Sequence, residues 1–145
     1  YCRISDTTIA MFILGSTNTL QVLNTQTGKR RLIADNIGRC FRYSPTRRLL
    51  YFLTKDNEKE WYINTLNTKT YKTEKLVKTP EGSEDYTLLT DGRIIIGKDA
   101  VLYVLEDDHW ASLYDFSSYF SGFYRIVVNR EGTLLALVVY TGKKP

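Results

Sequence analysis

The residues with the greatest capacity for chemistry are a histidine and two carboxylates in the second half of the chain. His109 is the only histidine, and it directly follows Asp107 and Asp108. Such an Asp-Asp-His segment could supply metal ligands or a general base. The same residues are also typical of the tip of a β-hairpin, and we favour this structural interpretation. The sequence therefore predicts no metal site and no catalytic residue here.

Other catalytic patterns are also absent from the sequence. No Gly-x-Ser-x-Gly segment occurs, so a Ser-His-Asp triad would have no nucleophile elbow. Carboxylate pairs such as Glu58 with Glu60, or Glu106 with Asp108, fall in expected loops and strand ends, where solvated charge is favoured over acid–base catalysis. Gly-rich phosphate loops and calcium-loop spacings are missing. We therefore predict a protein that is not an enzyme and needs no cofactor.

An aromatic segment is the best candidate for binding. Residues 114–124 contain six aromatic side chains, interleaved with Ser and Gly. Tyr and Phe on a loop supply large contact areas for a protein, a peptide or a sugar. The alternative is that these rings fill the space between adjacent sheets. We take Tyr119 and Phe120 as candidate ligand-binding residues.

The composition is that of a globular protein without a strong preference for anionic partners. Of the 145 residues, 43% are hydrophobic and 25% charged, and the 13% of aromatic residues favours strands over helices. The net charge is +4, but basic residues are scattered among acidic ones, which favours a solvated surface over a nucleic-acid patch. No window approaches the roughly 18 consecutive apolar residues of a membrane helix. We expect neither a nucleic-acid partner nor a membrane span.

Four similar segments recur along the chain, each joining a polar turn to an apolar strand. The clearest is residues 43–52, Tyr-Ser-Pro-Thr-Arg-Arg-Leu-Leu-Tyr-Phe, and the four are anchored on Ser5, Ser44, Thr90 and Asn129. Their spacing of about 40 residues is the length of a four-stranded propeller blade. The repeat therefore predicts one blade for each segment.

The stretches between these anchors have the pattern of β-strands. Apolar runs at 9–14, 49–53, 94–96 and 134–140 are continuous, which predicts second strands buried on both faces. Third strands are expected at 20–23, 61–66 and 101–105. Polar fourth strands at 30–34, 71–77 and 110–114 suit an exposed sheet edge. Turns rich in Asn, Thr and Gly at 24–29 and 67–70 join third to fourth strands.

These observations predict an all-β fold, a β-propeller sector built of four-stranded antiparallel blades. The blades are expected at residues 1–35, 39–77, 84–117 and, incompletely, 122–145. Propellers have four to eight blades, so we expect a single propeller-like domain that is part of a longer propeller. An assembly of partial propellers that closes between chains is the less favoured alternative. Because the chain begins at Tyr1 and not at Met, we expect a trimmed, processed or partial sequence.

Two pairs of residues occupy equivalent or nearly equivalent places in the first two blades. Arg3 and Arg42 precede the repeated turn, where they either line the central channel or form ion pairs. Arg42 is our third candidate ligand-binding residue. Cys2 and Cys40 match no zinc or redox spacing, and two separate buried thiols are favoured over a disulfide.

The repeated segments resemble the Ser-Pro-Asp-Gly-Lys-x-(apolar)-Ala-Phe units of TolB-like, WD-related β-propellers. Residues 44–45 supply the Ser-Pro half, residues 91–93 supply Asp-Gly-Arg, and residues 9–12 supply Ile-Ala-Met-Phe. The resemblance implies a propeller architecture over nearly the whole chain. It also favours an exported location, periplasmic or extracellular, while the residues themselves leave the compartment open.

These features favour a non-catalytic β-propeller module that binds or scaffolds a protein or peptide, with a small ligand as an alternative. One rival is an accessory propeller of a larger enzyme, such as a prolyl-oligopeptidase-type serine hydrolase, since similar propellers gate such enzymes. A carbohydrate-active or lyase propeller is a second rival. It would need a cluster of His and Arg, and the single histidine argues against it.

Overall fold

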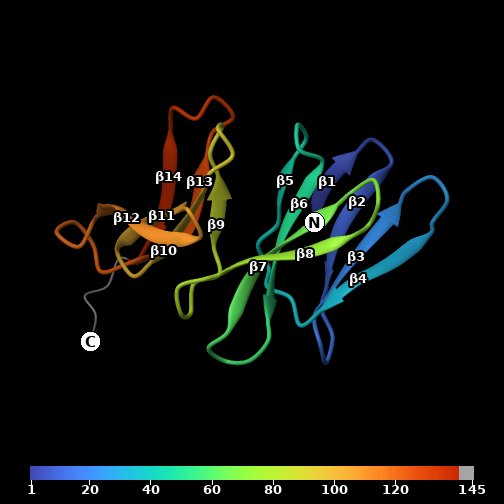
Figure 1. Cartoon of the computed structure of the whole chain (residues 1–145), viewed down its shortest axis with the longest axis horizontal. Helices are drawn as coiled ribbons and strands as arrows, with labels where there is room; N and C mark the ends of the chain where they lie inside the picture. Colours follow the sequence, from blue (N-terminus) through green and yellow to red (C-terminus); the bar gives the residue numbers. More distant parts are fainter. Residues whose placement is uncertain (141–145) are drawn as a thin grey trace. The chain divides into compact units, whose positions relative to one another are not determined.

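Every described element of the chain is a β-strand. The computed structural model describes residues 1–140, and the 14 strands in this range form four antiparallel sheets, with no helix among them (Figure 1). Three sheets have four strands and the last has two. The predicted all-β fold of four-stranded antiparallel blades is confirmed, and the fourth blade has only its first two strands within this range.

Strands that follow one another in the chain are also neighbours in each sheet. The first sheet contains β1 (Cys2–Ser5), β2 (Thr8–Ile13), β3 (Thr19–Asn24) and β4 (Arg30–Asp35). The second contains β5 (Arg42–Ser44), β6 (Leu49–Lys55), β7 (Trp61–Asn67) and β8 (Thr73–Lys78). The third contains β9 (Tyr86–Leu88), β10 (Ile94–Lys98), β11 (Val101–Glu106) and β12 (His109–Asp115). The fourth contains β13 (Phe123–Val128) and β14 (Leu135–Val139).

The chain divides into two compact units, Tyr1–Thr79 and a second that begins at Pro80. The division falls in the segment 79–83 that the sequence indicates as a connector between blades. Each unit contains two sheets that share an apolar core. In the first unit this core joins side chains of the first and second sheets, among them Leu20 and Phe52. In the second unit, Leu102 of the third sheet packs with Ile126 of the fourth.

The burial of the second strands follows the prediction in two sheets and departs from it in the other two. Residues 50–53 of β6 and 94–96 of β10 are all at most 3% exposed, as expected. In β2, Ala10 is fully buried while its neighbours are half-buried. Burial of the run 134–140 was predicted wrongly, because Leu134 is 70% and Tyr140 56% exposed. Among the described residues, β14 pairs only with β13, so one edge and one face of this strand have no cover.

The fourth strands lie at exposed outer edges, as predicted, and each contains a β-bulge at the same point. In each sheet the bulge lies opposite two successive residues of the third strand. These residues are Leu20 and Gln21, Ile63 and Asn64, and Leu102 and Tyr103. The unpaired extra residues are Ile33, Leu76 and Leu113. Bulges increase the local twist and turn an edge away from further pairing. Three sheets therefore share one irregularity, which supports their origin as repeats of one unit.

The turns after β3 and β7 also share one hydrogen-bond pattern. Oδ1 of Asn24 accepts the N–H groups two and three residues further on, at 3.1 and 2.9 Å, and Oδ1 of Asn67 does the same at 3.0 Å for both.

The fifth residue of each turn has a positive φ, 69° for Gly28 and 60° for Tyr71. This conformation costs a tyrosine about 1 kcal/mol. The Tyr71 ring offsets that cost by packing on the core of the first unit and against the Arg31 guanidinium, 4.6 Å away. Since Tyr71 belongs to the turn, β8 begins at Thr73 and not at the predicted residue 71.

The contact between the two sheets of the second unit depends on a glycine. The Phe123 ring lies on the backbone of Gly97, and a Cβ added to Gly97 would be only 2.0 Å from Cε2 of Phe123. Phe123 is 8% exposed and belongs to the core of this unit. The absence of a side chain at Gly97 therefore allows β10 and β13 to approach each other.

We predict that Gly97→Ala destabilises the protein by about 2 kcal/mol, because the Phe123 ring must leave its position. Urea denaturation followed by tryptophan fluorescence measures this change. Replacing Phe123 with the smaller Leu should recover part of the loss in the double variant Gly97→Ala/Phe123→Leu. A destabilisation that is purely additive in the double variant would contradict the proposed contact.

Asn67→Ala is expected to destabilise the protein by about 1 kcal/mol, because two backbone N–H groups of the turn lose their acceptor. Thermal denaturation of the purified variant provides the measurement. Lys69→Ala is the matched control, since it removes an exposed side chain of the same turn and leaves the backbone donors unchanged. Equal effects of the two substitutions would show that the Asn67 amide does not hold the turn.

Candidate functional site

The aromatic segment begins with a tight turn directly after β12. Oδ1 of Asp115 accepts the N–H of Ser117 at 2.7 Å, and this hydrogen bond lowers the pKa of the Asp115 carboxyl. The carbonyl of Phe116 accepts the N–H groups of Tyr119 and Phe120 at 2.8 and 3.2 Å. In turn, the N–H of Phe116 donates to the carbonyl of Ala100 at 2.8 Å. Backbone and side-chain hydrogen bonds therefore fix the turn on the third sheet.

Phe116 is the centre of a cluster of aromatic rings. Its ring centroid lies 4.5 Å from that of Tyr114, 5.3 Å from the nearly parallel ring of Phe120, and 6.5 Å from the perpendicular ring of Phe123. Both Phe116 and Phe120 pack against the core of the second unit. We call Tyr114, Phe116, Tyr119, Phe120 and Phe123 the aromatic cluster. It joins the sequence-predicted residues Tyr119 and Phe120 to the core.

Two members of the aromatic cluster are exposed. Tyr119 is 73% and Tyr114 50% exposed. The neighbouring Tyr119, mainly through the charge of its ionised form, raises the pKa of Tyr114. The centroid of the Tyr119 ring lies 6.5 Å from that of the Phe116 ring, and the two ring planes form an angle of 61°. Phe120 therefore fills space within the unit, while Tyr119 presents its ring to solvent. Ligand binding by either residue stays a prediction.

Arg42 lies on β5, an edge strand of the second sheet, and is half-buried. Its guanidinium Nη1 donates to the carbonyl of Phe41 at 2.9 Å. The equivalent Arg3 lies on the neighbouring strand β1 and forms an ion pair with Asp6. Arg3 therefore forms an ion pair, one of the two alternatives that the sequence left open. A ligand contact of Arg42 stays a prediction.

The two cysteines are separate free thiols, as predicted. Cys40 is buried, with 2% of its surface exposed, and Cys2 is half-buried against the core of the first unit. Burial raises the pKa of the Cys2 thiol, although the charges of the N-terminus and Arg42 act in the opposite direction. The thiol is therefore held in its protonated, unreactive form at neutral pH.

The predicted hairpin tip at His109 is confirmed. Asp107 and Asp108 form the turn between β11 and β12 with positive φ values of 43° and 66°, and His109 begins β12. Nδ1 of His109 lies 3.3 Å from the backbone carbonyl of Asp107. Within residues 1–140, no three His, Cys, Asp or Glu side chains gather in a group suited to a metal ion.

The part of the chain that the structure describes also contains no helix long and apolar enough to cross a membrane.

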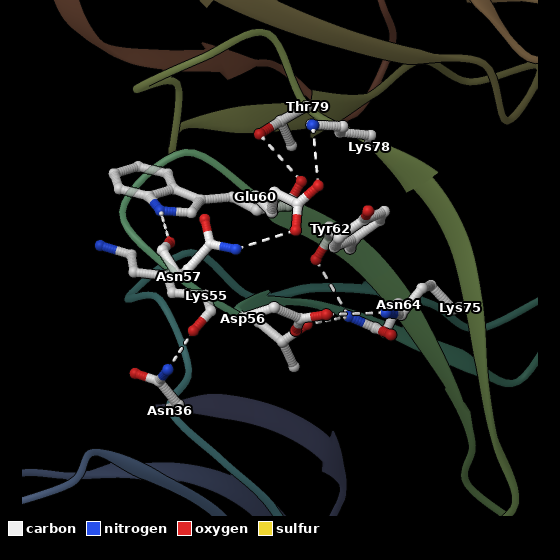
Figure 2. A network of polar contacts seen from close by, with 12 residues as sticks. Asn36, Lys55, Asp56, Asn57, Glu60, Tyr62, Asn64, Lys75, Lys78 and Thr79 are labelled. Atoms are coloured by element: carbon white, nitrogen blue, oxygen red, sulfur yellow. Dashed lines mark hydrogen bonds and ion pairs between the residues drawn. The ribbon is translucent and has the colours of Figure 1, made fainter.

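A network of polar contacts joins the loop between β6 and β7 to the outer strand β8 (Figure 2). Nζ of Lys75 lies 2.8 Å from Oδ2 of Asp56, and Nζ of Lys78 lies 3.3 Å from Oε1 of Glu60. The amide of Asn57 donates to the other oxygen of Glu60 at 2.8 Å. This bond, followed by the contacts with Lys78, lowers the pKa of Glu60. The network stabilises the folded loop, since its charges are paired within one sheet.

Two lysines of this network also lie over aromatic rings. Nζ of Lys55 is 4.0 Å from the ring centroid of Trp61, and Nζ of Lys75 is 4.0 Å from that of Tyr62. The alternating Lys and Glu residues of β8 indicate an exposed strand but do not reveal these partners. The partners depend on the pairing register of β7 and β8, which places Asn64 opposite Lys75. Sequence reasoning therefore missed the network.

No protein-family model and no curated protein sequence matches this chain. Several solved structures share its fold. TolB from Acinetobacter baumannii matches with a TM-score of 0.73 and 17% identity, over 94% of this chain and 36% of the TolB chain. The extracellular domain of a hybrid two-component system protein from B. thetaiotaomicron matches with a TM-score of 0.59 and 14% identity, over 90% of this chain and 20% of that one.

The β-propeller domain of the Trilobed protease from Pyrococcus furiosus matches with a TM-score of 0.50 and 14% identity, over 75% of this chain and 38% of that domain. The chain thus spans little more than a third of each of these structures at most. At these identities the likeness concerns the fold alone. The chain therefore has a TolB-like β-propeller fold, with three four-stranded blades and the first two strands of a fourth.

Proposed function

We propose that this chain is a non-catalytic propeller module that binds a protein or peptide through the exposed side of its aromatic cluster. The observation that supports this proposal most strongly is the placement of Tyr119. Its ring is 73% exposed and yet is held by Phe116, whose position is fixed by the core. A rigid, exposed tyrosine offers contact area at a small cost in side-chain entropy.

The exposure of these rings favours a protein or peptide over a small ligand. Small molecules are usually bound in concave pockets that bury most of their surface. Tyr119 and Tyr114 instead present a hydroxyl group and part of a ring on the surface. Tyrosines of this kind are enriched in protein interfaces, where an apolar ring and a polar group act together.

The proposed lack of catalysis rests on where the most reactive residue types lie. His109 contacts the backbone of its own hairpin, and Cys40 is buried. The acidic residues of the network in Figure 2 are paired with lysines of the same sheet. These residues therefore have structural surroundings that explain them without a reaction.

A second candidate function is that of an accessory propeller within a larger enzyme. The likeness to the propeller domain of the Trilobed protease favours it, although this likeness concerns the fold. A Gly-x-Ser-x-Gly segment in the same native polypeptide, with hydrolysis of a peptide substrate by that polypeptide, would support this candidate.

We expect Tyr119→Ala to weaken partner binding about tenfold without unfolding the protein, because its ring is exposed. The immobilised chain and its variants are compared in affinity capture, with retained proteins quantified by mass spectrometry. At least one protein should be retained about tenfold less by Tyr119→Ala than by the unsubstituted chain. Tyr1→Ala is the matched control, since Tyr1 is 90% exposed and lies outside the aromatic cluster. If all proteins that the chain retains are retained equally by both variants, the proposal is wrong.

Phe120→Ala should instead destabilise the chain by about 2 kcal/mol, because the ring is half-buried between Phe116 and Phe123. Chemical denaturation measures this loss. Tyr119→Ala should change the free energy of unfolding by less than about 0.5 kcal/mol in the same assay. A neutral effect of Phe120→Ala would contradict its packing role.

A further inference from the structure

Three hairpin turns at one end of the first unit bring together basic residues that are far apart in the sequence. These turns follow β3, β5 and β7, and Figure 1 shows them at the same end of the unit. With the first residues of β4 they form the segments 24–31, 45–48 and 67–72, which contain seven basic residues and no acidic one. The other 13 basic residues of the chain are outnumbered by its 16 acidic residues. The chain is therefore positive overall because of these three segments.

Direct contacts join the three turns. The guanidinium of Arg31 lies 4.6 Å from the centroid of the Tyr71 ring, which connects the first sheet to the turn after β7. The carbonyl of Arg48 accepts the N–H of Thr68 at 3.0 Å and its hydroxyl at 3.1 Å, which connects the turn after β5 to the same turn. All basic side chains of these turns are exposed. We call Lys29, Arg31, Arg48, Lys69 and Lys72 the basic patch.

No carboxylate of the described residues neutralises the basic patch. Within residues 1–140, none of its five members forms an ion pair. Asp6, in the turn after β1, is already paired with Arg3. Glu74 lies opposite Thr65 in the ladder between β7 and β8, so its side chain points to the other face of the second sheet from Leu66 and the shared core. The patch therefore gathers positive charge without a counterion from its own unit.

The opposite end of the second sheet has a different arrangement of charges. There, Nζ of Lys75 lies 2.8 Å from the carboxylate of Asp56. Nζ of Lys78 lies 3.3 Å from the carboxylate of Glu60 (Figure 2). Like charges that are gathered without partners repel one another and destabilise a compact fold. The contrast between the two ends therefore indicates that the basic patch has a purpose outside the folded chain.

Backbone strain supports the same conclusion. The turns between first and second strands in the second, third and fourth sheets each contain one residue with positive φ, namely Arg48 (54°), Gly92 (89°) and Gly132 (73°). In the turns after β3 and β7 the corresponding residues are Gly28 and Tyr71. This conformation is strained for most residues other than glycine, and such strain is concentrated at functional sites. Both strained residues serve the basic patch, since Arg48 is a member and Tyr71 holds Arg31.

We propose that the basic patch binds an acidic segment of a partner protein, rich in Asp and Glu. The members of the patch come from three turns, so a ligand that contacts all of them must carry several anionic groups. The carboxylates of an extended acidic segment meet this condition, and guanidinium groups bind carboxylates through paired hydrogen bonds. The inference goes beyond the proposed function, because it adds a second binding surface that does not depend on the aromatic cluster.

The surroundings of the basic patch favour a protein over a nucleic acid. Single-stranded nucleic acids are bound where successive bases stack on exposed aromatic rings. Tyr71 is the one aromatic residue in the three segments. Its ring packs on the core of the first unit and is covered by the guanidinium of Arg31. It is therefore not open to a base, whereas carboxylates need no such ring.

The test measures binding of a fluorescein-labelled octaglutamate peptide to the full chain by fluorescence anisotropy. The double variant Lys69→Gln/Lys72→Gln should weaken binding about fivefold, because two exposed cations of the patch are lost. The matched control Lys59→Gln/Arg130→Gln removes the same charge from exposed residues outside the patch, and its effect should stay below about twofold. Raising the NaCl concentration from about 50 to about 300 mM should weaken binding to the unsubstituted chain about tenfold, since the charges are exposed to solvent.

The variant Arg48→Gly separates binding from stability. Glycine adopts a φ of 54° without strain, so the melting temperature should not fall by more than about 2 °C. Peptide binding should nevertheless weaken about threefold, because a cation of the patch is lost. A purely structural role of Arg48 predicts the reverse, a lower melting temperature with unchanged binding.

Three results would overturn the proposal. The first is no binding of the peptide at about 50 mM NaCl, and the second is an equal loss of binding in the two double variants. The third is tighter binding of a single- or double-stranded oligonucleotide of matched charge, weakened by Lys69→Gln/Lys72→Gln. Tyr119→Ala is included in the same titration and should bind the peptide normally. A failure at the basic patch therefore leaves the capture experiment on Tyr119 to be judged separately.

Discussion

The structure depends on each apolar sheet face being covered by the face of another sheet. Within each unit this constraint selects the core, because Phe52 and Ile126 are almost completely buried only where two sheets meet. Burying such a side chain contributes about 2 kcal/mol relative to leaving it in water. Where a face has no partner among the described residues, as on the outer side of β14, the same kind of side chain stays exposed. Packing between sheets, and not the sequence of a single strand, therefore decides burial.

The aromatic cluster lies where the region covered by both sheets of the second unit ends. Phe116, Phe120 and Phe123 are packed because the third and fourth sheets meet around them. Tyr114 and Tyr119 extend the same stack of rings into solvent. The cluster therefore connects the core to the surface, and its exposed rings contact rings that belong to the core.

Much of the fold could be predicted from the sequence because turns and apolar runs are local signals. Residues 49–53 and the Asn-Thr turns after β3 and β7 indicated strands and hairpins at the observed places. Burial of residues 134–140 was predicted wrongly, since an apolar run does not show whether a neighbouring strand is present. The lysine–aromatic contacts of Figure 2 depend on strand register, and the closeness of Gly97 to Phe123 depends on how two sheets pack. Neither property is encoded in a short stretch of residues.

The hairpin connectivity of the sheets has a consequence for how the protein folds. Within residues 1–140, all strand pairs join consecutive strands, so each sheet closes only short loops and can form from a continuous stretch of chain. We therefore expect the sheets to appear one after another as the chain leaves the ribosome. Within each unit, the first sheet would have one bare face until the second packs on it. Aggregation during synthesis would then be governed by the most recently formed sheet, and a pause in translation would be most harmful directly after an apolar second strand.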